Sequence, residues 1–340
     1  MNPVLYIESR KHKNSKLWFN LKNLAEYCIP NYFYRRSLAS KLALLENYDS
    51  EDIMARVNYY NKLTTFYSCG ASSNYFSELK CNTSAFCSEG FIKIKDFTLA
   101  KGYTPHTHFF DTYQYVRYFN SDERFSFLFG DITKTPSIPQ IVKSRPINGD
   151  NANSIVLNLN KVRHFMFIND KINFEDKKNM LVGRGAIYQK HRVRFYEKYF
   201  NHPLCDLGHV GGKISHLEWN KGLLPISKHL EYKFILCLEG NDVASNLKWV
   251  MSSNSIAVMP KPKYETWFME GKLKADYHYI AIKDDYSDLE EKLQYYIHNT
   301  GEALEIIKNA HAFVNQFKDP DREDLCALLV LKKYFELQKG

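Results

Sequence analysis

The sequence predicts an α/β fold with two domains, and two observations lead to this prediction. The chain has 340 residues, which is more than one compact core of typical size holds. In the second half, apolar runs of strand length alternate with segments of helical periodicity. Such alternation predicts a parallel sheet whose strands are joined by right-handed helical crossovers.

In the first half, residues 16–30 and 35–63 have helical periodicity. Three apolar runs are predicted to be strands: FIKIKDFTLA (91–100), YQYVRYF (113–119) and FSFLFGD (125–131). The proline-rich segment 134–154 is predicted to be a structured loop that leads into a connection between the domains.

In the second half, the predicted strands are NMLVGRG (179–185), LCDLGHVG (204–211), FILCLEG (234–240), SIAVMP (255–260) and HYIAIKD (278–284). A basic, aromatic helix is predicted at 186–200, between the first two strands. Ser287 followed by Glu290 has the spacing of a capping box, which predicts the start of another helix.

Composition is that of a soluble globular protein, with 44% apolar and 25% charged residues. No run of about 18 uncharged apolar residues occurs, and the N-terminus lacks the apolar core of a secretory signal. The seven cysteines show no paired metal-ligand spacing, which indicates reduced thiols. We therefore expect a cytoplasmic location and no membrane span.

The net charge of +8 favours anionic partners: nucleic acid, phosphorylated metabolites or an anionic membrane surface. Basic residues gather at 10–16, 35–41 and 190–194, although each short cluster taken alone is typical of a solvated face. The stretch QKHRVRFYEKYF (189–200) interleaves cations with aromatic rings, which would also suit a nucleic-acid-binding protein.

The turn Glu239-Gly240-Asn241-Asp242 follows a predicted strand and precedes a predicted helix. Ligands of parallel sheets bind at the carboxyl ends of strands, and a helix N-terminus there favours anions. Two carboxylates would repel a phosphate, however, and suit sugar hydroxyls or a capping role for Asp242. A ligand site and an ordinary capped turn both remain open at this point.

Common phosphate-binding, metalloprotease and hydrolase motifs are absent. Arg184-Gly185 ends a predicted strand, where an arginine could grip a diphosphate with two hydrogen bonds and a glycine would let the backbone approach. A surface arginine in a turn is the commoner arrangement. Lys248, on the helix after the turn at 239–242, could supply a second cation.

Asp131 ends the apolar strand FSFLFGD, where a carboxylate facing a cleft could act as general base toward a hydroxyl. An aspartate that opens a turn with Thr133 is the commoner arrangement. His106 and His108 are alternative bases or polar loop residues. Glu265 follows a later strand and needs either a partner or solvent.

The segment NMLVGRGA (179–186), followed by EYKFILCLEGNDVASNLKWVMSSNSIAVMPKPKYETWFMEGKLKADYHYIAIKDD (231–285), resembles glycosyltransferase family 90. The resemblance is to the bacterial lipopolysaccharide-core branch, with which LCDLGHVG and LVLKKYFE (329–336) agree. The family also includes fungal capsule xylosyltransferase-like proteins and animal protein O-glucosyltransferases. The resemblance covers residues 125–320 well and the first hundred residues poorly.

The resemblance implies a GT-B architecture, in which two Rossmann-like domains face each other across a cleft. The domains would be 1–160, carrying the base, and 161–325, binding the donor, with 326–340 as a C-terminal helix. It also implies an inverting enzyme that needs no metal or other cofactor and uses UDP-glucose or UDP-galactose as donor. The acceptor would be a hydroxyl of a lipid-linked lipopolysaccharide or lipooligosaccharide core sugar.

The resemblance assigns Asp131 as the catalytic base and places Pro139 and Arg145 downstream of it. The implied donor-binding residues are Arg184, Gly185, Tyr232, Glu239, Gly240, Asp242, Ala244, Ser245, Asn246, Lys248 and Glu265. One departure concerns the register of the family's second donor-binding arginine, which here holds Leu247 beside Lys248.

Peripheral association with the anionic cytoplasmic face of the inner membrane is expected, through basic and aromatic residues of the first half. No nucleic-acid partner is expected, and the alternative hypothesis is a basic nucleic-acid-binding protein without catalysis.

Overall fold

In the computed structural model, which describes residues 15–68, 86–88, 90–212 and 216–338, the chain forms two compact units. Among these residues, unit 1 comprises 163–262 and 271–316. Unit 2 comprises 15–162 together with 263–270 and 317–338, so two segments of the second half of the sequence pack with the first half. The contiguous boundaries 1–160, 161–325 and 326–340 remain a prediction.

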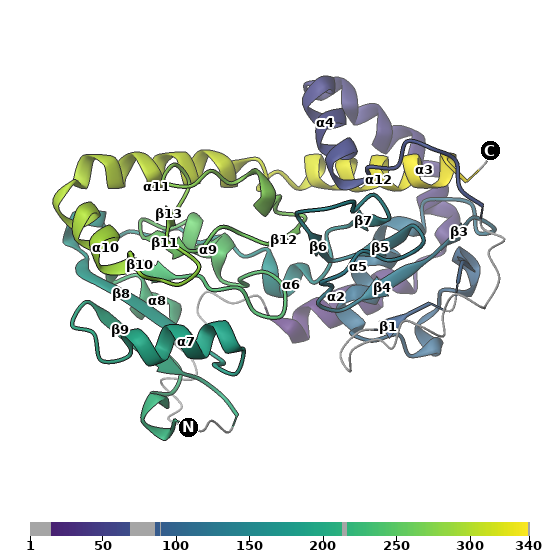
Figure 1. The fold of residues 1–340 in the computed structure, drawn as a ribbon. Coiled ribbons are helices and arrows are strands. Elements are labelled where there is room, and N and C mark those ends of the chain that lie inside the picture. The colour runs from purple at the N-terminus through teal and green to yellow at the C-terminus, as the bar shows by residue number, and fades with distance from the viewer. Residues whose placement is uncertain (1–14, 69–85, 89, 213–215, 339–340) are drawn as a thin grey trace. The chain divides into compact units, whose positions relative to one another are not determined.

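Figure 1 labels most of the described helices and strands. The helices are α2 (Lys16–Tyr27), α3 (Asn31–Ala43), α4 (Ser50–Tyr60), α5 (His106–Val116), α6 (Lys161–His164), α7 (Lys190–Tyr199), α8 (Ile226–His229), α9 (Leu247–Met251), α10 (Leu289–His298), α11 (Thr300–Asn315) and α12 (Pro320–Glu336). The strands are β1 (Phe86–Cys87), β2 (Ile92–Lys93), β3 (Arg124–Phe125), β4 (Phe127–Phe129), β5 (Gln140–Val142), β6 (Ser144–Pro146), β7 (Ser154–Val156), β8 (Lys178–Gly185), β9 (Cys205–His209), β10 (Tyr232–Leu236), β11 (Ile256–Met259), β12 (Tyr264–Thr266) and β13 (Ile280–Ala281). None of the described helices is long and apolar enough to cross a membrane.

Unit 1 is built on a five-stranded sheet in the order β13-β11-β10-β8-β9. Every neighbouring pair in this sheet is parallel, which confirms the parallel sheet predicted from the alternation of strands and helices. Numbered along the chain, the order is 2-1-3-4-5, one of the two common doubly wound orders. The connection after β8 leads to β9 on one side of the sheet, and the connection after β10 leads to β11 on the other side. The strands β8 and β10 are themselves neighbours.

One face of this sheet carries a hydrophobic cluster of unit 1. Its apolar side chains, such as Leu181, Leu207 and Phe234, pack with residues of α7, α10 and α11. Gly183 lies in the middle of β8, where an added Cβ would be 3.0 Å from Leu207 Cδ2 and 3.1 Å from Leu236 Cδ2. The glycine thus lets two leucines close over the strand.

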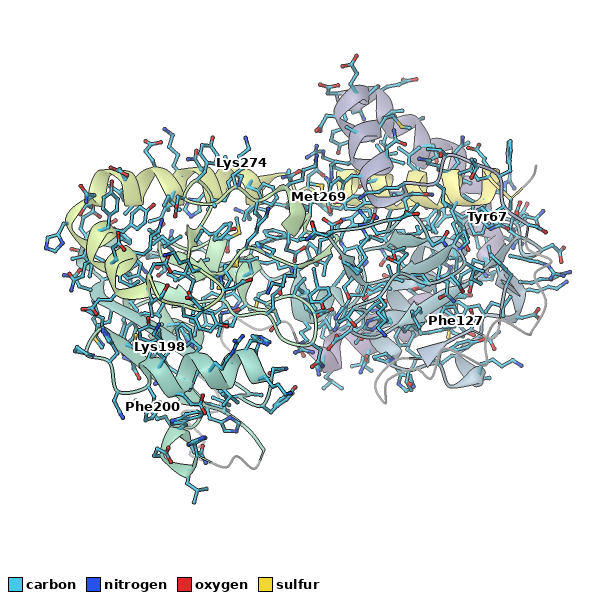
Figure 2. All side chains as sticks on the ribbon, in the orientation of Figure 1. Tyr67, Phe127, Lys198, Phe200, Met269 and Lys274 are labelled. Atoms are coloured by element: carbon cyan, nitrogen blue, oxygen red, sulfur yellow. The ribbon has the colours of Figure 1, made fainter. Side chains whose placement is uncertain are left out.

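Unit 2 contains a four-stranded sheet in the order β1-β4-β5-β7, with β1 antiparallel and the other three strands parallel. Two short antiparallel pairs, β2-β3 and β6-β12, complete its strands. The core is rich in aromatic rings around Phe127, which is labelled in Figure 2. Phe97 and Phe129 lie 5.4 Å and 4.2 Å from it between ring centroids.

The C-terminal helix α12 is buried along much of its length and packs on α3, α4 and α5. Its Glu323 carboxylate accepts a hydrogen bond of 2.6 Å from Arg56 of α4 and another from the indole of Trp267. Trp267 stacks on Tyr60 with ring centroids 3.8 Å apart. A buried ion pair and stacked rings therefore connect three distant segments of unit 2.

Three local predictions were wrong. YQYVRYF is not a strand, because residues 106–116 form α5 and bury Phe109, Tyr115 and Val116 at helical spacing. FIKIKDFTLA keeps only Ile92–Lys93 as a strand before two short 3-10 turns. The predicted helix at 35–63 is two helices, because Asp49 caps a new one through the N–H groups of Glu51 and Asp52.

Two further details also differ. The proline-rich segment 134–154 is not only a loop, since it contributes β5, β6 and the first residue of β7. The capping box at Ser287 is absent, because α10 begins at Leu289 with Asp288 at its N-cap and without a side-chain capping bond. The helix itself was predicted in the right place.

Candidate active site

The carboxyl ends of β8 and β10 form the topological switch point of the unit 1 sheet. In open parallel sheets this is the place where ligands bind, because the loops that leave it diverge and open a crevice. Gly185 is the last residue of β8, and Glu239 and Gly240 follow β10. Two of the predicted donor-binding segments thus lie on neighbouring strands at the same edge of one sheet.

Arg192, in the first turn of α7, lies at this switch point. Its guanidinium donates to the carbonyl oxygens of Ala186 (3.0 Å), Leu238 (2.8 Å) and Glu239 (2.8 Å). A Cβ added at Gly185 would lie 3.6 Å from Arg192 Nη1, and one at Gly240 would lie 3.5 Å from Nη2. The side chain therefore sits against both glycines.

The charge of Arg192 has no carboxylate partner among the residues that the structure describes. A guanidinium has five N–H donors, and three of them bond to carbonyl oxygens, so two are left for another acceptor. Burial lowers the pKa of Arg192 from its usual value, yet an arginine stays protonated in proteins. A half-buried cation with two donors at a switch point suits an anionic ligand.

Neighbouring contacts hold the same two loops. His191 donates through Nε2 to the Glu239 carbonyl oxygen at 2.8 Å. Gln189 donates to the side-chain oxygen of Asn241 at 3.3 Å. The start of α7 is thereby attached to the turn at 239–242.

Arg184 has a different environment from the one expected of a residue facing a diphosphate. Its side chain turns back along β9 and donates to Asp206, with 2.8 Å between Nη2 and Oδ1. Lys221 Nζ is 3.6 Å from the same carboxylate, and the Tyr232 hydroxyl donates to it at 2.7 Å. A Cβ at Gly208 would lie 2.9 Å from Arg184 Nε, so only glycine leaves room for this path.

The partners of Asp206 favour its ionised form. Burial raises the pKa of Asp206, but hydrogen bonds from Tyr232 and Arg184 outweigh burial and bring that pKa below its usual value. Burial and the neighbouring Asp206 raise the pKa of Tyr232 to about 12. Tyr232 begins β10, so it lies at the opposite end of the strand from Gly240. The donor-binding roles of Arg184 and Tyr232 remain predictions.

The other predicted donor-binding residues from the end of β10 to the start of α9 lie in the turn at 239–242 or directly after it. Asn246 donates to the Leu236 carbonyl oxygen at 3.0 Å, which connects the residue before α9 to the end of β10. The remaining side chains divide into two groups by burial: Asp242, Ala244 and Lys248 are buried, and Glu239 and Ser245 are half-buried. The structure thus collects most of the predicted donor-binding set around one strand end.

In unit 2, Asp131 and Lys143 meet at the carboxyl edge of the parallel strands. Phe127 pairs with Ile141, and Leu128 with Val142, so the residues that follow β4 and β5 emerge at the same level. Lys143 forms an ion pair with the Asp131 carboxylate. The Lys143 side chain is 2% exposed and that of Asp131 is 28% exposed. A buried cation therefore holds an accessible carboxylate in place.

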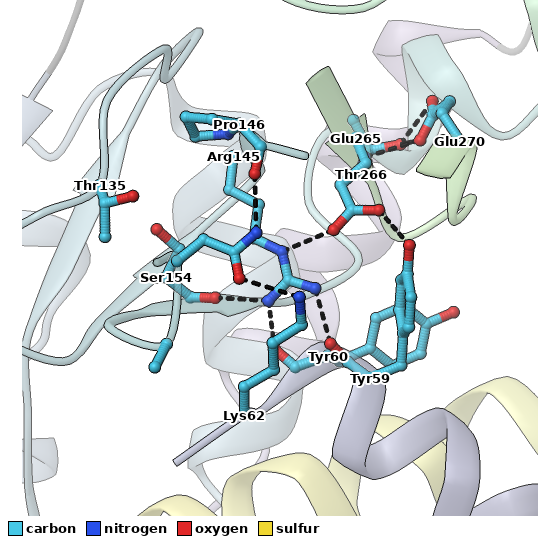
Figure 3. A network of polar contacts seen from close by, with 12 residues as sticks. Tyr59, Tyr60, Lys62, Thr135, Arg145, Pro146, Ser154, Glu265, Thr266 and Glu270 are labelled. Carbon is cyan, nitrogen blue, oxygen red and sulfur yellow. Dashed lines mark hydrogen bonds and ion pairs between the residues drawn. The ribbon is translucent and has the colours of Figure 1, made fainter. Parts of the chain in front are cut away.

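Glu265 lies in the interior of unit 2, on β12, in the network of Figure 3. Its Oε1 accepts a 2.8 Å hydrogen bond from Arg145 Nε, and its other oxygen accepts from the Tyr59 hydroxyl. Arg145 also donates to the carbonyl oxygens of Ser154 (3.1 Å), Tyr59 (2.6 Å) and Tyr60 (3.3 Å). Neither Arg145 nor Glu265 is more than 1% exposed.

This network joins β6, β12 and α4 through one buried ion pair. Burial and the adjacent Glu265 raise the pKa of Tyr59, which keeps its hydroxyl proton as a donor. The arrangement is that of a structural brace, and donor binding by Glu265 remains a prediction.

The basic, aromatic stretch 189–200 does not provide a stacking surface. Phe195, Tyr196 and Tyr199 of α7 are buried in the core of unit 1. Rings that are packed against a sheet cannot stack on nucleic-acid bases. The geometry therefore does not favour the nucleic-acid hypothesis.

Sequence reasoning missed Arg192, Lys143 and Asp206. Arg192 lies in a run of four basic residues at 190–194, which is also the pattern of a solvated helix face. Lys143 lies twelve residues after Asp131, and only the register of β4 and β5 brings the two together. Among the described residues, no group of three or more His, Cys, Asp or Glu could hold a metal ion.

Comparison with known proteins adds three findings. Residues 209–340 match the family described as Glycosyl transferase family 90. The O-glucosyltransferase LpsA of Dichelobacter nodosus is 39% identical over 325 residues, which cover 95% of this chain and 96% of that protein. Protein O-glucosyltransferase 3 of Homo sapiens is 30% identical over 111 residues, or 32% of this chain and 22% of that protein.

The Arg145–Glu265 pair predicts a stability effect that does not depend on any ligand. In Glu265→Gln the buried Arg145 loses its counter-charge, and we expect the free energy of unfolding to fall by about 3 kcal/mol. Glu231→Gln removes two surface ion pairs, with Lys228 and Lys178, and is the matched control, with an expected loss below about 1 kcal/mol. Urea denaturation measures both, and equal midpoints for Glu265→Gln and the unsubstituted protein would contradict a bracing role.

Proposed function

Because the chain belongs to glycosyltransferase family 90, we propose that it transfers a hexose from a UDP-sugar to a sugar hydroxyl of a lipopolysaccharide core. The name of the Dichelobacter nodosus relative, an O-glucosyltransferase, favours glucose over galactose as the hexose. Family membership also supports a GT-B enzyme, with unit 1 as the donor-binding domain and unit 2 as the domain that carries the base.

The observation that carries the proposal is the placement of Arg192 at the switch point of the unit 1 sheet. A UDP-sugar presents two phosphates, which need donors and positive charge in a fixed position. Arg192 offers two N–H groups there, and the absence of side chains at Gly185 and Gly240 leaves room for its guanidinium. The guanidinium is held by three carbonyl oxygens, so it need not reorganise as charge develops on the leaving group.

Asp131 is the proposed general base. Its carboxylate takes the proton of the acceptor hydroxyl while the hydroxyl oxygen forms a bond to the anomeric carbon of the donor. The bond between that carbon and the diphosphate oxygen breaks, and UDP leaves with the electron pair. A single displacement of this kind inverts the configuration at the anomeric carbon.

Lys143 is the proposed positioning residue of this step. It lies behind Asp131, is itself buried, and acts through the carboxylate rather than on a substrate. An ion pair from a buried cation restricts the rotation of the carboxylate, which favours one geometry of proton transfer.

The charge that grows on the departing UDP requires stabilisation. Arg192 is proposed to supply it, and the roles of Arg184 and Lys248 on the diphosphate remain predictions from the family resemblance. Fixed cations of this kind would replace a divalent metal, so we propose that transfer does not need one. We also propose that the enzyme works at the cytoplasmic face of the inner membrane, where a lipid-linked acceptor would be presented.

Asp131→Asn tests the assignment of the base. The amide cannot accept the proton, so we expect sugar transfer from UDP-glucose to purified core acceptor to fall by at least about a hundredfold. UDP binding, measured by calorimetry, should stay unchanged, because the substituted residue does not contact the donor. Asp96→Asn replaces an exposed carboxylate of the same unit and serves as the control. Normal turnover of Asp131→Asn would exclude Asp131 as the base.

Arg192→Gln tests the diphosphate site. Loss of charge-assisted hydrogen bonds should weaken UDP binding by about tenfold to a hundredfold. Arg192→Lys keeps the charge without the planar fork, and we expect it to recover only part of the affinity. Arg194→Gln, on the exposed side of the same helix, is the control. Unchanged UDP affinity in Arg192→Gln would refute the site, and the melting temperature without ligand reports any loss of folding.

A further inference from the structure

We infer that helix α2, together with the start of α3, is the surface through which this protein binds an anionic lipid bilayer. The inference rests on the proposed function only in that a lipid-linked acceptor requires the enzyme to reach a membrane. The observation that supports the inference is the orientation of α2, whose apolar side faces solvent.

Helix α2 begins at Lys16, after Ser15 accepts a hydrogen bond from the Trp18 N–H at its N-cap. Its ring contacts with the rest of unit 2 lie on one side of the helix. Phe19 packs edge-on against Phe110 with centroids 6.4 Å apart, and Tyr27 lies 4.8 Å from Tyr113. No residue of α2 is buried.

The opposite side of α2 carries four large apolar residues that water can reach. The exposed fractions are 71% for Leu17, 69% for Trp18, 53% for Leu21 and 47% for Leu24. Positions 17, 21 and 24 recur at helical spacing, so these leucines form a stripe along the helix. A globular helix normally turns such a stripe inward, and an outward one marks an interaction surface.

At the start of α3, Tyr32 and Phe33 are also exposed, by 53% and 61%. Residues 15–43 contain five lysines and arginines, at 16, 22, 35, 36 and 41, and a single acidic residue, Glu26. Lys22 and Lys41 pair with Glu26 and Asp321, at 3.7 Å and 4.0 Å, while Lys16, Arg35 and Arg36 are exposed. The segment is therefore both apolar and basic.

This chemistry fits a bilayer surface. Leucines enter the boundary between headgroups and acyl chains, tryptophan and tyrosine rings favour the headgroup level, and lysines and arginines pair with anionic lipid. A helix that lies flat in the membrane interface buries an apolar stripe of this kind among the lipids. The net charge of +8 adds a longer-range attraction to the anionic leaflet.

Co-sedimentation with vesicles of phosphatidylcholine, with and without phosphatidylglycerol, tests the inference on the full chain. We expect binding to the anionic vesicles and its loss by at least about tenfold in Leu17→Ser/Leu21→Ser. Arg35→Ser/Arg36→Ser should weaken binding by about fivefold per charge, and only on vesicles that contain phosphatidylglycerol. Leu217→Ser/Leu223→Ser, two exposed leucines of unit 1, is the matched control and should bind normally.

The outcomes separate the inference from the proposed function. Unchanged vesicle binding in Leu17→Ser/Leu21→Ser, or no binding by the unsubstituted protein, overturns the inference and leaves sugar transfer untouched. A dimer in light scattering that dissociates in this variant, without vesicle binding, would assign the surface to a second copy and also overturn it. Absence of UDP binding would count against the proposed function alone. Equal melting temperatures show that the substitutions leave the fold intact.

Discussion

Three hydrogen bonds from Arg192 to backbone carbonyls join the loop after β8 to the loop after β10. β8 and β10 are neighbours whose crossovers leave in opposite directions, so the loops that follow them diverge. His191 and Gln189 also connect the start of α7 to the loop after β10. The guanidinium connects the two loops while its charge stays uncompensated by any described carboxylate, so one side chain both holds the loops together and makes this edge of the sheet attractive to an anion.

Unit 2 uses its buried charges differently. Arg145 with Glu265, and Arg56 with Glu323, are compensated pairs that connect segments far apart in the sequence. Removing one member of such a pair leaves a charge in the interior, which explains why they act as braces. Asp131 with Lys143 is the exception, because the carboxylate remains accessible while its cation is buried. The accessible carboxylate is therefore the one suited to contact a substrate.

The parallel sheet of unit 1 could be predicted from the sequence, because strands and helices alternate there with clear periodicity. The turn at 239–242 and Asp131 could also be placed at strand ends. The direction of a side chain could not be predicted, because nothing in the sequence indicates that Arg184 folds back onto Asp206. Pairings that depend on strand register, such as Asp131 with Lys143, leave no signal in sequence spacing, and YQYVRYF fits strand and helix periodicities equally well.

The central claim is that a UDP-sugar binds at the carboxyl ends of β8 and β10. A crystal structure of the protein with UDP bound tests it most directly. We expect diphosphate oxygens within hydrogen-bonding distance of the Arg192 guanidinium and beside Gly185 and Gly240. Diphosphate bound instead beside Tyr232 and Asp206, with Arg192 remote from it, would contradict the account.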